Sequence, residues 1–284
     1  MKNIMTLADA VALNVHDGDT VAMEGFTHLI PFAAGHEIIR QQRRDLRLVR
    51  MTPDVIYDQL IGAGCARELV FSWGGNPGVG SLHRFREAVD LAYPRSLELD
   101  EHSHAGMSVR YSAGASGLPF GTLRGYVGTD LTKYTDNVRR ITCPFTGESL
   151  AAVSALNPDV GVIHAQQADR HGNVGFWGIL GVQKEAILAS RRSIVTVEEV
   201  VDEFDPSVRV VLPHWVVSAV AVVPRGAHPS YAHGYYDRDN AYYRAWDEIS
   251  RDRDVFSQWI QTHIMNTSDF SEHLAMVEPT LAEV

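Results

Sequence analysis

The segment Asp100–His104 concentrates side chains that can carry out chemistry, because it holds two carboxylates and two imidazoles in five consecutive residues. Glu101 suits the role of a carboxylate nucleophile or general base, with a neighbouring histidine, His102 or His104, tuning its ionisation. A helix beginning just after Glu101 would favour the ionised form. The other interpretation is an acidic residue at the start of a helix, which is very common.

The same segment can be drawn as a metal site, but its spacing argues against one. A pair of histidines at i and i+2 fits a strand better than a helix, and no third histidine follows at a usual spacing. The sequence holds only two cysteines, Cys65 and Cys143, which are too few for a disulfide framework or a structural zinc site. We therefore expect no bound metal.

Two glycine-containing turns are candidates for binding a ligand. The first, Glu24–Pro31, follows an apolar run, and the second, Trp73–Ser81, follows another. In open α/β sheets, ligands bind at the carboxyl ends of the strands, where free N–H groups and helix N-termini point toward them. The candidate substrate-binding residues of these turns are Gly25, Phe26, Thr27, Gly74, Gly75 and Asn76, joined by His102 and His104. The alternative is that both turns are ordinary connections between elements.

Several common catalytic motifs are missing from the sequence. It contains no GxxxxGK[ST] phosphate loop, no HExxH helix and no GxSxG turn. The glycine-rich stretch Gly75–Gly80 lacks the GxGxxG register of a dinucleotide-binding turn. The sequence therefore gives no support to a P-loop enzyme, a zinc protease, a serine hydrolase of the elbow type or a nicotinamide enzyme.

The elements that must position these residues alternate along the chain. Apolar, β-branched runs of strand length cover residues 20–23, 46–51, 69–73, 160–166, 193–197 and 216–223. Helical patterns cover residues 7–14, 34–44, 54–62, 82–91 and 182–191. Runs that are apolar on both faces and alternate with helices predict an α/β fold with an open, mostly parallel sheet flanked by helices. We expect one domain over residues 1–284, of which 235–284 form a helical C-terminal extension.

Composition narrows the class of protein further. The 284 residues include 25 basic and 35 acidic side chains, which gives a formal net charge of −10. This acidity argues against binding a nucleic-acid backbone, because that affinity rests on Lys and Arg neutralising phosphates. No apolar stretch reaches the roughly 20 residues needed to cross a bilayer, and the N-terminus does not resemble a signal peptide. We expect a cytoplasmic protein without a membrane anchor.

Taken together, seven segments resemble the alpha subunit of the two-subunit family I CoA-transferases, closest to the glutaconate CoA-transferase branch. They occur in the family's order and cover nearly the whole chain. They are Glu24–Phe26 before Pro31, Glu101–His104, Ala113–Phe120, Gly128–Asp130, His164–Asn173, Gly178–Glu185 and Gly226–Pro229.

The resemblance implies a partner, a site and a chemistry. The partner is a homologous CoA-transferase beta subunit, in a heterodimer or heterotetramer, and the active site lies between the two subunits. The substrates are an acyl-CoA thioester and a small carboxylic acid, with no permanently bound cofactor. A glutamate, normally supplied by the beta subunit, attacks the thioester and carries CoA as a glutamyl thioester. Backbone N–H groups near Gly25 would hold the charge that develops on the substrate.

Two alternatives remain open at this point. A related branch contains hydrolases that cleave rings of CoA thioesters from steroids, and there a glutamate of the alpha subunit performs the catalysis at the position that Glu101 matches. The other alternative is a non-catalytic structural subunit. Candidate anchors for an interface between subunits are Trp73, Trp177, Tyr235 and Tyr236, with core packing as the other interpretation of Trp177.

Overall fold

The computed structural model describes residues 3–281 and is built around a mixed sheet in which most strands are parallel. The parallel strands lie in the order β12-β10-β8-β1-β2-β3-β4. They span Ala219–Val222, Arg192–Val201, Val160–Asp169, Thr20–Glu24, Leu46–Val49, Ala66–Phe71 and Glu98–Glu101, in that order. Two short strands, β9 (Val174–Phe176) and β11 (Val210–Leu212), extend the sheet in the antiparallel sense. The predicted open, mostly parallel sheet is confirmed.

One face of the sheet packs against the first helices of the chain. These are α1 (Leu7–Asn14), α2 (Phe32–Arg40) and α3 (Val55–Gly62), with α4 (His83–Leu91) beside them. Their apolar side chains form the main core with the central strands. The strand β8 is covered on both faces of the sheet, because nine of its ten residues are buried and successive side chains point to opposite faces.

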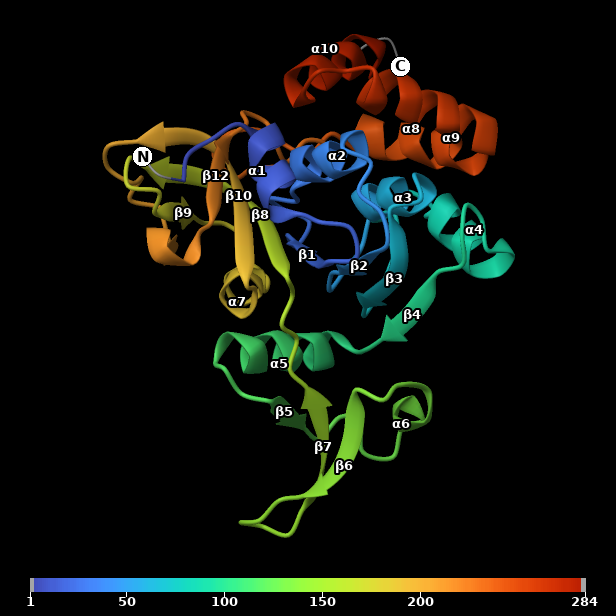
Figure 1. Cartoon of the computed structure of the whole chain (residues 1–284), viewed down its shortest axis with the longest axis vertical. Coiled ribbons are helices and arrows are strands. Elements are labelled where there is room, and N and C mark those ends of the chain that lie inside the picture. Colours follow the sequence, from blue (N-terminus) through green and yellow to red (C-terminus); the bar gives the residue numbers. More distant parts are fainter. Residues whose placement is uncertain (1–2, 282–284) are drawn as a thin grey trace.

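The predicted C-terminal extension is helical and lies over α2 and α3 (Figure 1). It comprises α8 (Asn240–Arg251), α9 (Arg253–Ile260), a short π-helical turn (Gln261–Met265) and α10 (Phe270–Leu281). Trp246 and Trp259 from this extension belong to the same core as α2 and α3. A shared hydrophobic core therefore holds the extension against the rest of the fold.

The other face of the sheet is covered by α5 (His104–Ala115) and α7 (Gln183–Ala189) (Figure 1). Met107 and Tyr111 of α5 are fully buried there with Ala186 of α7. Helix α5 begins shortly after β4, and the Ser103 hydroxyl caps it by accepting a hydrogen bond from the Gly106 N–H at 3.0 Å. This cap fixes where the Asp100–His104 segment leaves the sheet.

A small antiparallel sheet that the sequence patterns do not predict projects from the main body beyond α5 (Figure 1). Its strands are β5 (Phe120–Leu123), β6 (Val138–Thr142) and β7 (Ser149–Ser154), in the order β5-β7-β6, and α6 (Leu131–Tyr134) precedes β6. Most residues of β5 and β6 are partly or fully exposed, so these strands lack the apolar runs that mark the central ones. None of the described helices is both long and apolar enough to cross a membrane.

Candidate active site

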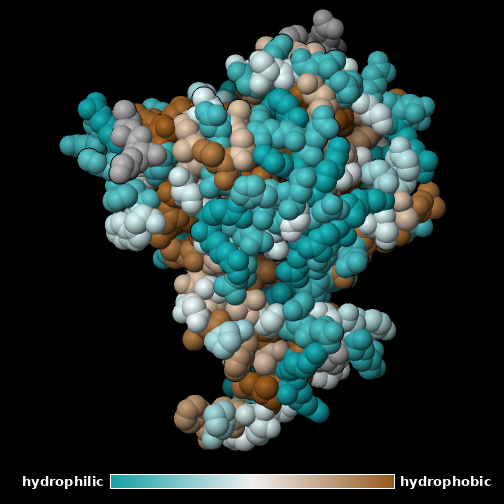
Figure 2. Space-filling view, viewed as in Figure 1, coloured by the Kyte–Doolittle hydropathy of each residue, from teal (hydrophilic) through white to brown (hydrophobic). Residues whose placement is uncertain are grey.

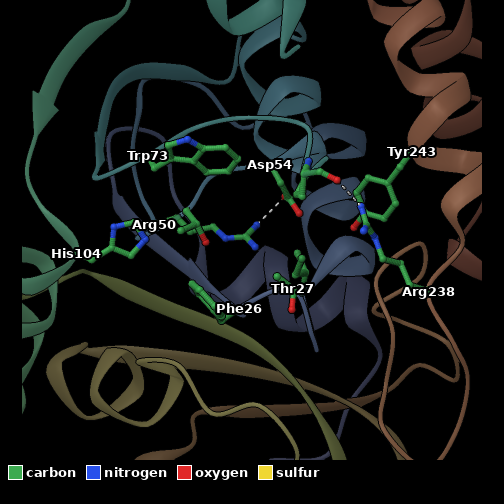
Figure 3. Close-up of a pocket in the computed structure, with 11 residues that line it drawn as sticks. Phe26, Thr27, Arg50, Asp54, Trp73, His104, Arg238 and Tyr243 are labelled. Atoms are coloured by element: carbon green, nitrogen blue, oxygen red, sulfur yellow. Dashed lines mark hydrogen bonds and ion pairs between the residues drawn. The ribbon is translucent and has the colours of Figure 1, made fainter. Parts of the chain in front are cut away.

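The carboxyl ends of β1, β2, β3 and β4 meet at one edge of the sheet because these four strands are adjacent and parallel. The turns after them form a cavity of about 280 Å³ (Figure 3). Its walls include Phe26, Thr27, Arg50, Asp54, Trp73 and His104 from these turns. Arg238 and Tyr243, from the segment that leads into and begins α8, complete it. This is the edge at which open α/β sheets bind ligands.

The turn after β1 is tightly folded. A side chain on Gly25 would place its Cβ 2.6 Å from the Leu29 carbonyl oxygen and 2.9 Å from the His28 carbonyl oxygen, so only glycine fits. Thr27 and Leu29 both have left-handed backbone conformations, with φ of 57° and 53°. Such a conformation costs a side-chain-bearing residue about 1–2 kcal/mol. The turn therefore holds Phe26 and Thr27 at the cavity against a local preference for a relaxed backbone.

Two contacts tie this turn to the C-terminal part of the chain. The Leu29 N–H donates to the Tyr231 carbonyl at 3.0 Å, and the Ile30 N–H donates to the Ser230 hydroxyl at 3.2 Å. Both contacts lie outside the regular sheet. They offset part of the strain by satisfying buried N–H groups.

A buried ion pair supports the cavity floor. Arg50 follows β2 directly, and its Nη1 lies 2.7 Å from Asp54 Oδ1 while its Nη2 donates to the Gly25 carbonyl at 2.8 Å. Both side chains are almost fully buried. Burial raises the pKa of Asp54, and the positive charge of Arg50 opposes that rise. Arg50 thereby links the turn after β1 to the turn after β2.

Glu24, the last residue of β1, is buried beside the residues that follow β2. Its Oε1 accepts hydrogen bonds from the Tyr111 hydroxyl at 2.8 Å and from the Met51 N–H at 2.9 Å. Burial raises the pKa of Glu24 to about 7, although Arg50 and these hydrogen bonds pull it down. The carboxyl group therefore exchanges its proton near neutral pH without lining the cavity.

His104 and Trp73 form the cavity wall on the side of β3 and β4. The Ser72 hydroxyl donates to the Met51 carbonyl at 2.6 Å, so His104 Nδ1, 3.2 Å from the same hydroxyl, is assigned as a donor to it. In the neutral ring this leaves Nε2 as the free acceptor. Trp73 is 47% exposed and Phe26 36%, and in Figure 3 these rings stand on opposite sides of the cavity.

The candidate residues predicted from the sequence take several different positions. Phe26, Thr27 and His104 line the cavity, and Gly25 lies directly beside it. Gly74 and Gly75 form the backbone between Trp73 and Asn76, and neither is among the lining residues. Asn76 is buried, and its side-chain amide donates to the Tyr243 carbonyl at 2.8 Å. It holds the turn after β3 against α8.

Glu101 and His102 lie beside the cavity rather than in its wall. The alternation of β4 leaves Glu101 exposed at the end of the strand while Asp100 and His102 are buried on the other side. The Glu101 carboxylate makes no hydrogen bond or ion pair with the described residues. His102 Nε2 lies 2.9 Å from Asp100 Oδ1 and 2.6 Å from Arg110 Nη1, so the structure shows it bonded to Asp100 rather than to Glu101.

Five cavity residues lie outside the candidate turns and the candidate list: Arg50, Thr52, Asp54, Arg238 and Tyr243. Arg50, Thr52 and Asp54 could have been found, because they lie at or just after the carboxyl end of the expected strand 46–51, at the edge where ligands bind. Arg238 lies in the segment 234–240, which is rich in polar and aromatic residues as loops that line sites often are, whereas Tyr243 carries no such signal. Within residues 3–281, no group of three or more His, Cys, Asp and Glu side chains is placed to hold a metal ion.

Comparisons with known proteins agree with this architecture. Residues 4–223 match the family model described as coenzyme A transferase. The chain is 64% identical to the alpha subunit of 3-oxoadipate CoA-transferase from Pseudomonas knackmussii, over 98% of this chain and 99% of that protein. It is 27% identical to a cholesterol ring-cleaving hydrolase subunit from Mycobacterium tuberculosis, over 92% of each.

The crystal structure of glutaconate CoA-transferase from Acidaminococcus fermentans superposes with a TM-score of 0.90 at 32% identity, covering 98% of this chain and 94% of that one. The mostly parallel sheet with its flanking helices is thus a known fold. The chain belongs to the coenzyme A transferase family, as an alpha subunit of the family I type.

Proposed function

We propose that this chain is the alpha subunit of an enzyme that transfers CoA between 3-oxoadipate and a second carboxylic acid. The observation that carries the proposal is the 64% identity to the alpha subunit of a 3-oxoadipate CoA-transferase over nearly the full length of both chains. The cavity at the carboxyl edge supports it, because aromatic walls and a cationic side chain suit an acyl chain that bears a carboxylate. The free thiols of Cys65 and Cys143 suit a reducing cytoplasm.

The attacking glutamate comes from a partner, the beta subunit. Among the described residues, Asp54 is the cavity's lining carboxylate, and it is engaged by Arg50 at 2.7 Å. A carboxylate so engaged and buried is a poor nucleophile. The partner's carboxylate therefore supplies the oxygen that attacks the thioester carbonyl, and the CoA thiolate leaves.

The remaining steps keep the activation stored in covalent bonds. The first attack gives an anhydride between the acyl group and the glutamate. The thiolate then attacks the glutamyl carbonyl, which releases the first acid and leaves a glutamyl-CoA thioester. The carboxylate of the second acid displaces CoA from this thioester, and the returning thiolate takes the new acyl group.

This chain binds and orients the substrate in that sequence. Backbone N–H groups at the Gly25–Thr27 turn stabilise negative charge on the thioester oxygen. Phe26 and Trp73 hold the acyl chain between their rings. Gly74 and Gly75 let the CoA arm approach the backbone, and His104 Nε2 accepts a hydrogen bond from the substrate.

The partner covers surfaces that are apolar and exposed in the single chain. In the segments that flank the strands of the small projecting sheet, Phe145 is 94% exposed, Tyr134 82% and Leu118 54%. In Figure 2 hydrophobic residues lie among hydrophilic ones on this projection. Trp73 and Tyr235 are also exposed, whereas Trp177 is buried, in agreement with core packing. We propose a heterodimer or heterotetramer on these surfaces.

Ring-cleaving hydrolysis is the second candidate function. The exposed Glu101 carboxylate, free of contacts with the described residues, is the observation that favours it. The hydrolase relative shares 27% identity with this chain, against 64% for the transferase relative. A purely structural subunit would leave the strained turn and the cavity of this chain without a role.

Covalent trapping separates these candidates. The chain is co-purified with its beta subunit, incubated with 3-oxoadipyl-CoA, reduced with borohydride and mapped by mass spectrometry. We expect a modified glutamate on the partner, and CoA exchange only when an acceptor acid is present. In the Glu101→Gln variant we expect at least about a tenth of the wild-type exchange rate, since Glu101 lies outside the cavity wall. Free CoA formed without an acceptor, and abolished by Glu101→Gln, would contradict the transferase.

A further inference from the structure

We propose that Arg238 binds the distal carboxylate of a dicarboxylic acyl group, that is, the carboxylate that does not become the thioester. This inference rests on the proposed function and adds to it the residue that selects dicarboxylic over monocarboxylic substrates. Four features of the cavity support it: the fixed position of the Arg238 guanidinium, its unused donors, the charge of the cavity and the arrangement of the walls.

The Arg238 guanidinium is held in place without forming an ion pair. Its Nη2 donates to the Pro77 carbonyl at 3.0 Å, and its Cζ lies 4.1 Å from the centroid of the Tyr243 ring. One neutral hydrogen bond and one cation–π contact orient the group, and no described carboxylate lies within ion-pair distance of it. A guanidinium offers five N–H donors in a planar fork that matches a carboxylate. Most of these donors remain available to a ligand in the cavity.

The acidic residues that flank Arg238 in the chain do not neutralise it. Asp239 accepts hydrogen bonds from His228 Nε2 at 2.9 Å and from the Tyr242 N–H at 2.9 Å. Asp237 forms no ion pair with Arg238 in the part of the chain that the structure describes. The positive charge of Arg238 is therefore available on the cavity side.

The charges that line the cavity leave one positive charge in excess. Arg50 and Arg238 are cations and Asp54 is the opposing anion, with Arg50 paired to it at 2.7 Å. Arg238 also lowers the pKa of Asp54 through its charge, but it makes no hydrogen bond to that carboxylate. Glu24 is not among the residues that line the cavity. A locally cationic cavity in a chain of net charge −10 points to an anionic occupant.

The arrangement of the walls fits a chain with a charged end. In Figure 3, Arg238 and His104 lie at opposite sides of the cavity, and Trp73 and Phe26 stand above and below the space between them. Aromatic faces in the middle suit the methylene groups of an acyl chain. The cation at one side then meets the terminal carboxylate.

A phosphate of CoA is the other anion that this guanidinium could bind. The two sources are separable, because every acyl-CoA carries the same phosphates while only dicarboxylic acyl groups carry the second carboxylate. A comparison of two thioesters of equal chain length, 3-oxoadipyl-CoA and 3-oxohexanoyl-CoA, isolates the carboxylate. In a ping-pong reaction the kcat/KM of the donor thioester reports only the first half-reaction, so the acceptor acid does not affect the comparison.

The test uses the complete complex with the beta subunit and the variants Arg238→Met and Arg238→Lys. We expect Arg238→Met to lower kcat/KM for 3-oxoadipyl-CoA by about 10- to 100-fold, as for loss of a charge-assisted hydrogen bond. For 3-oxohexanoyl-CoA we expect a change of less than about threefold, because that substrate has no group for Arg238 to bind. Arg238→Lys keeps the charge without the planar fork and is expected to fall between the two.

Arg244→Met is the matched control. Arg244 is an exposed arginine on α8 and is not among the cavity residues, so both substrates should react as with the wild type. Equal losses for the two thioesters in Arg238→Met would assign the guanidinium to a CoA phosphate and overturn the proposal. An Arg238→Met variant that keeps the wild-type kcat/KM for both thioesters would also overturn it. If the wild-type complex transfers CoA from neither thioester, the proposed function itself fails, which is a different result.

Discussion

The carboxyl edge of the sheet and the interface beneath the C-terminal helices both bury polar groups, but they do so in different chemical forms. At the carboxyl edge the buried groups are ionisable carboxyls and an arginine, Glu24, Asp54 and Arg50, next to a turn with left-handed residues. Beneath the helices two imidazoles lie near the buried carboxyl of Asp58. His36 and His273 are fully buried, with ring centroids 4.5 Å apart, and Asp58 accepts a hydrogen bond from Trp246 Nε1 at 3.0 Å.

The imidazoles beneath the helices act as neutral packing groups. His36 Nε2 lies 2.9 Å from Gln59 Oε1, and His273 Nδ1 lies 2.9 Å from the His263 carbonyl. Burial lowers the pKa of His36 well below its usual value and that of His273 to about 3. The ring of Trp259 packs against both.

Stability and function are therefore divided between these two regions. The turn at the carboxyl edge is locally strained and presents accessible groups to a ligand. The helical interface is well packed and carries the segment that brings Arg238 and Tyr243 to the cavity. A well-packed interface thus supports a strained turn.

The buried carboxyl group of Glu24 gives the strongest test of this contrast. Because its pKa is raised to about 7 in the folded protein, the folded state keeps a proton that the unfolded state loses above its ordinary pKa of 4.5. The free energy of unfolding therefore falls as pH rises from 4.5 to 7. We expect Glu24→Gln to remove about 3 kcal/mol of this fall, measured by urea unfolding across that range.

In Glu24→Gln the amide oxygen still accepts from Tyr111 and Met51, so the packing is retained. Burial also raises the pKa of Asp58 to about 7. Asp58 remains in the variant, so part of the fall in the free energy of unfolding with pH remains as well. An unchanged slope in the variant would mean that Arg50 keeps Glu24 ionised, and the contrast between the two regions would then be wrong for this residue.

The strained turn gives the next test. In Gly25→Ala the added Cβ meets the Leu29 carbonyl at 2.6 Å and the Ile30 Cα at 2.9 Å, which are backbone atoms that cannot move independently. We expect CoA transfer to fall by about 100-fold, because displacements on the order of 1 Å at a reacting site have such effects. The measurement is the exchange rate of labelled CoA in the complex with the beta subunit.

Gly125→Ala is the control for that substitution. Its nearest atom would be Leu123 Cδ1 at 3.8 Å, an ordinary contact, so the variant should retain full activity. Full activity of Gly25→Ala as well would show that the turn tolerates relaxation and that its strain has no function.

The neutral imidazoles give the mildest test. Burial lowers the pKa of His273 to about 3. Below the ordinary histidine pKa of 6.5 the unfolded state therefore binds a proton that the folded state does not bind. The free energy of unfolding should therefore fall as the pH drops from 6.5. We expect His273→Asn, which keeps a donor for the His263 carbonyl, to reduce the loss at about pH 5 by about 2 kcal/mol.

The stability profiles of Glu24 and His273 slope in opposite directions with pH, so the two variants should tilt the profile of the protein in opposite senses. Urea unfolding of both variants over one pH series tests this directly. The same tilt in both would contradict the opposite pKa shifts of Glu24 and His273.

The central strands of this protein and the turn after β1 could be predicted from local sequence signals. Apolar β-branched runs such as residues 160–166 belong to strands because only a sheet covered on both faces buries them completely. The turn at Glu24–Pro31 was also readable, since a glycine directly after a strand marks a close backbone approach. Each of these signals is carried by neighbouring residues.

The composition of the site depended on how the elements pack. The cavity joins turns that follow four strands to Arg238 and Tyr243 from the C-terminal segment, and His102 bonds Asp100 instead of Glu101. The projecting sheet was missed because its strands are half exposed and carry no continuous apolar run. Hydrophobic periodicity and turn chemistry report each element's own environment, whereas the distant side chains that share a cavity are brought together only by tertiary packing.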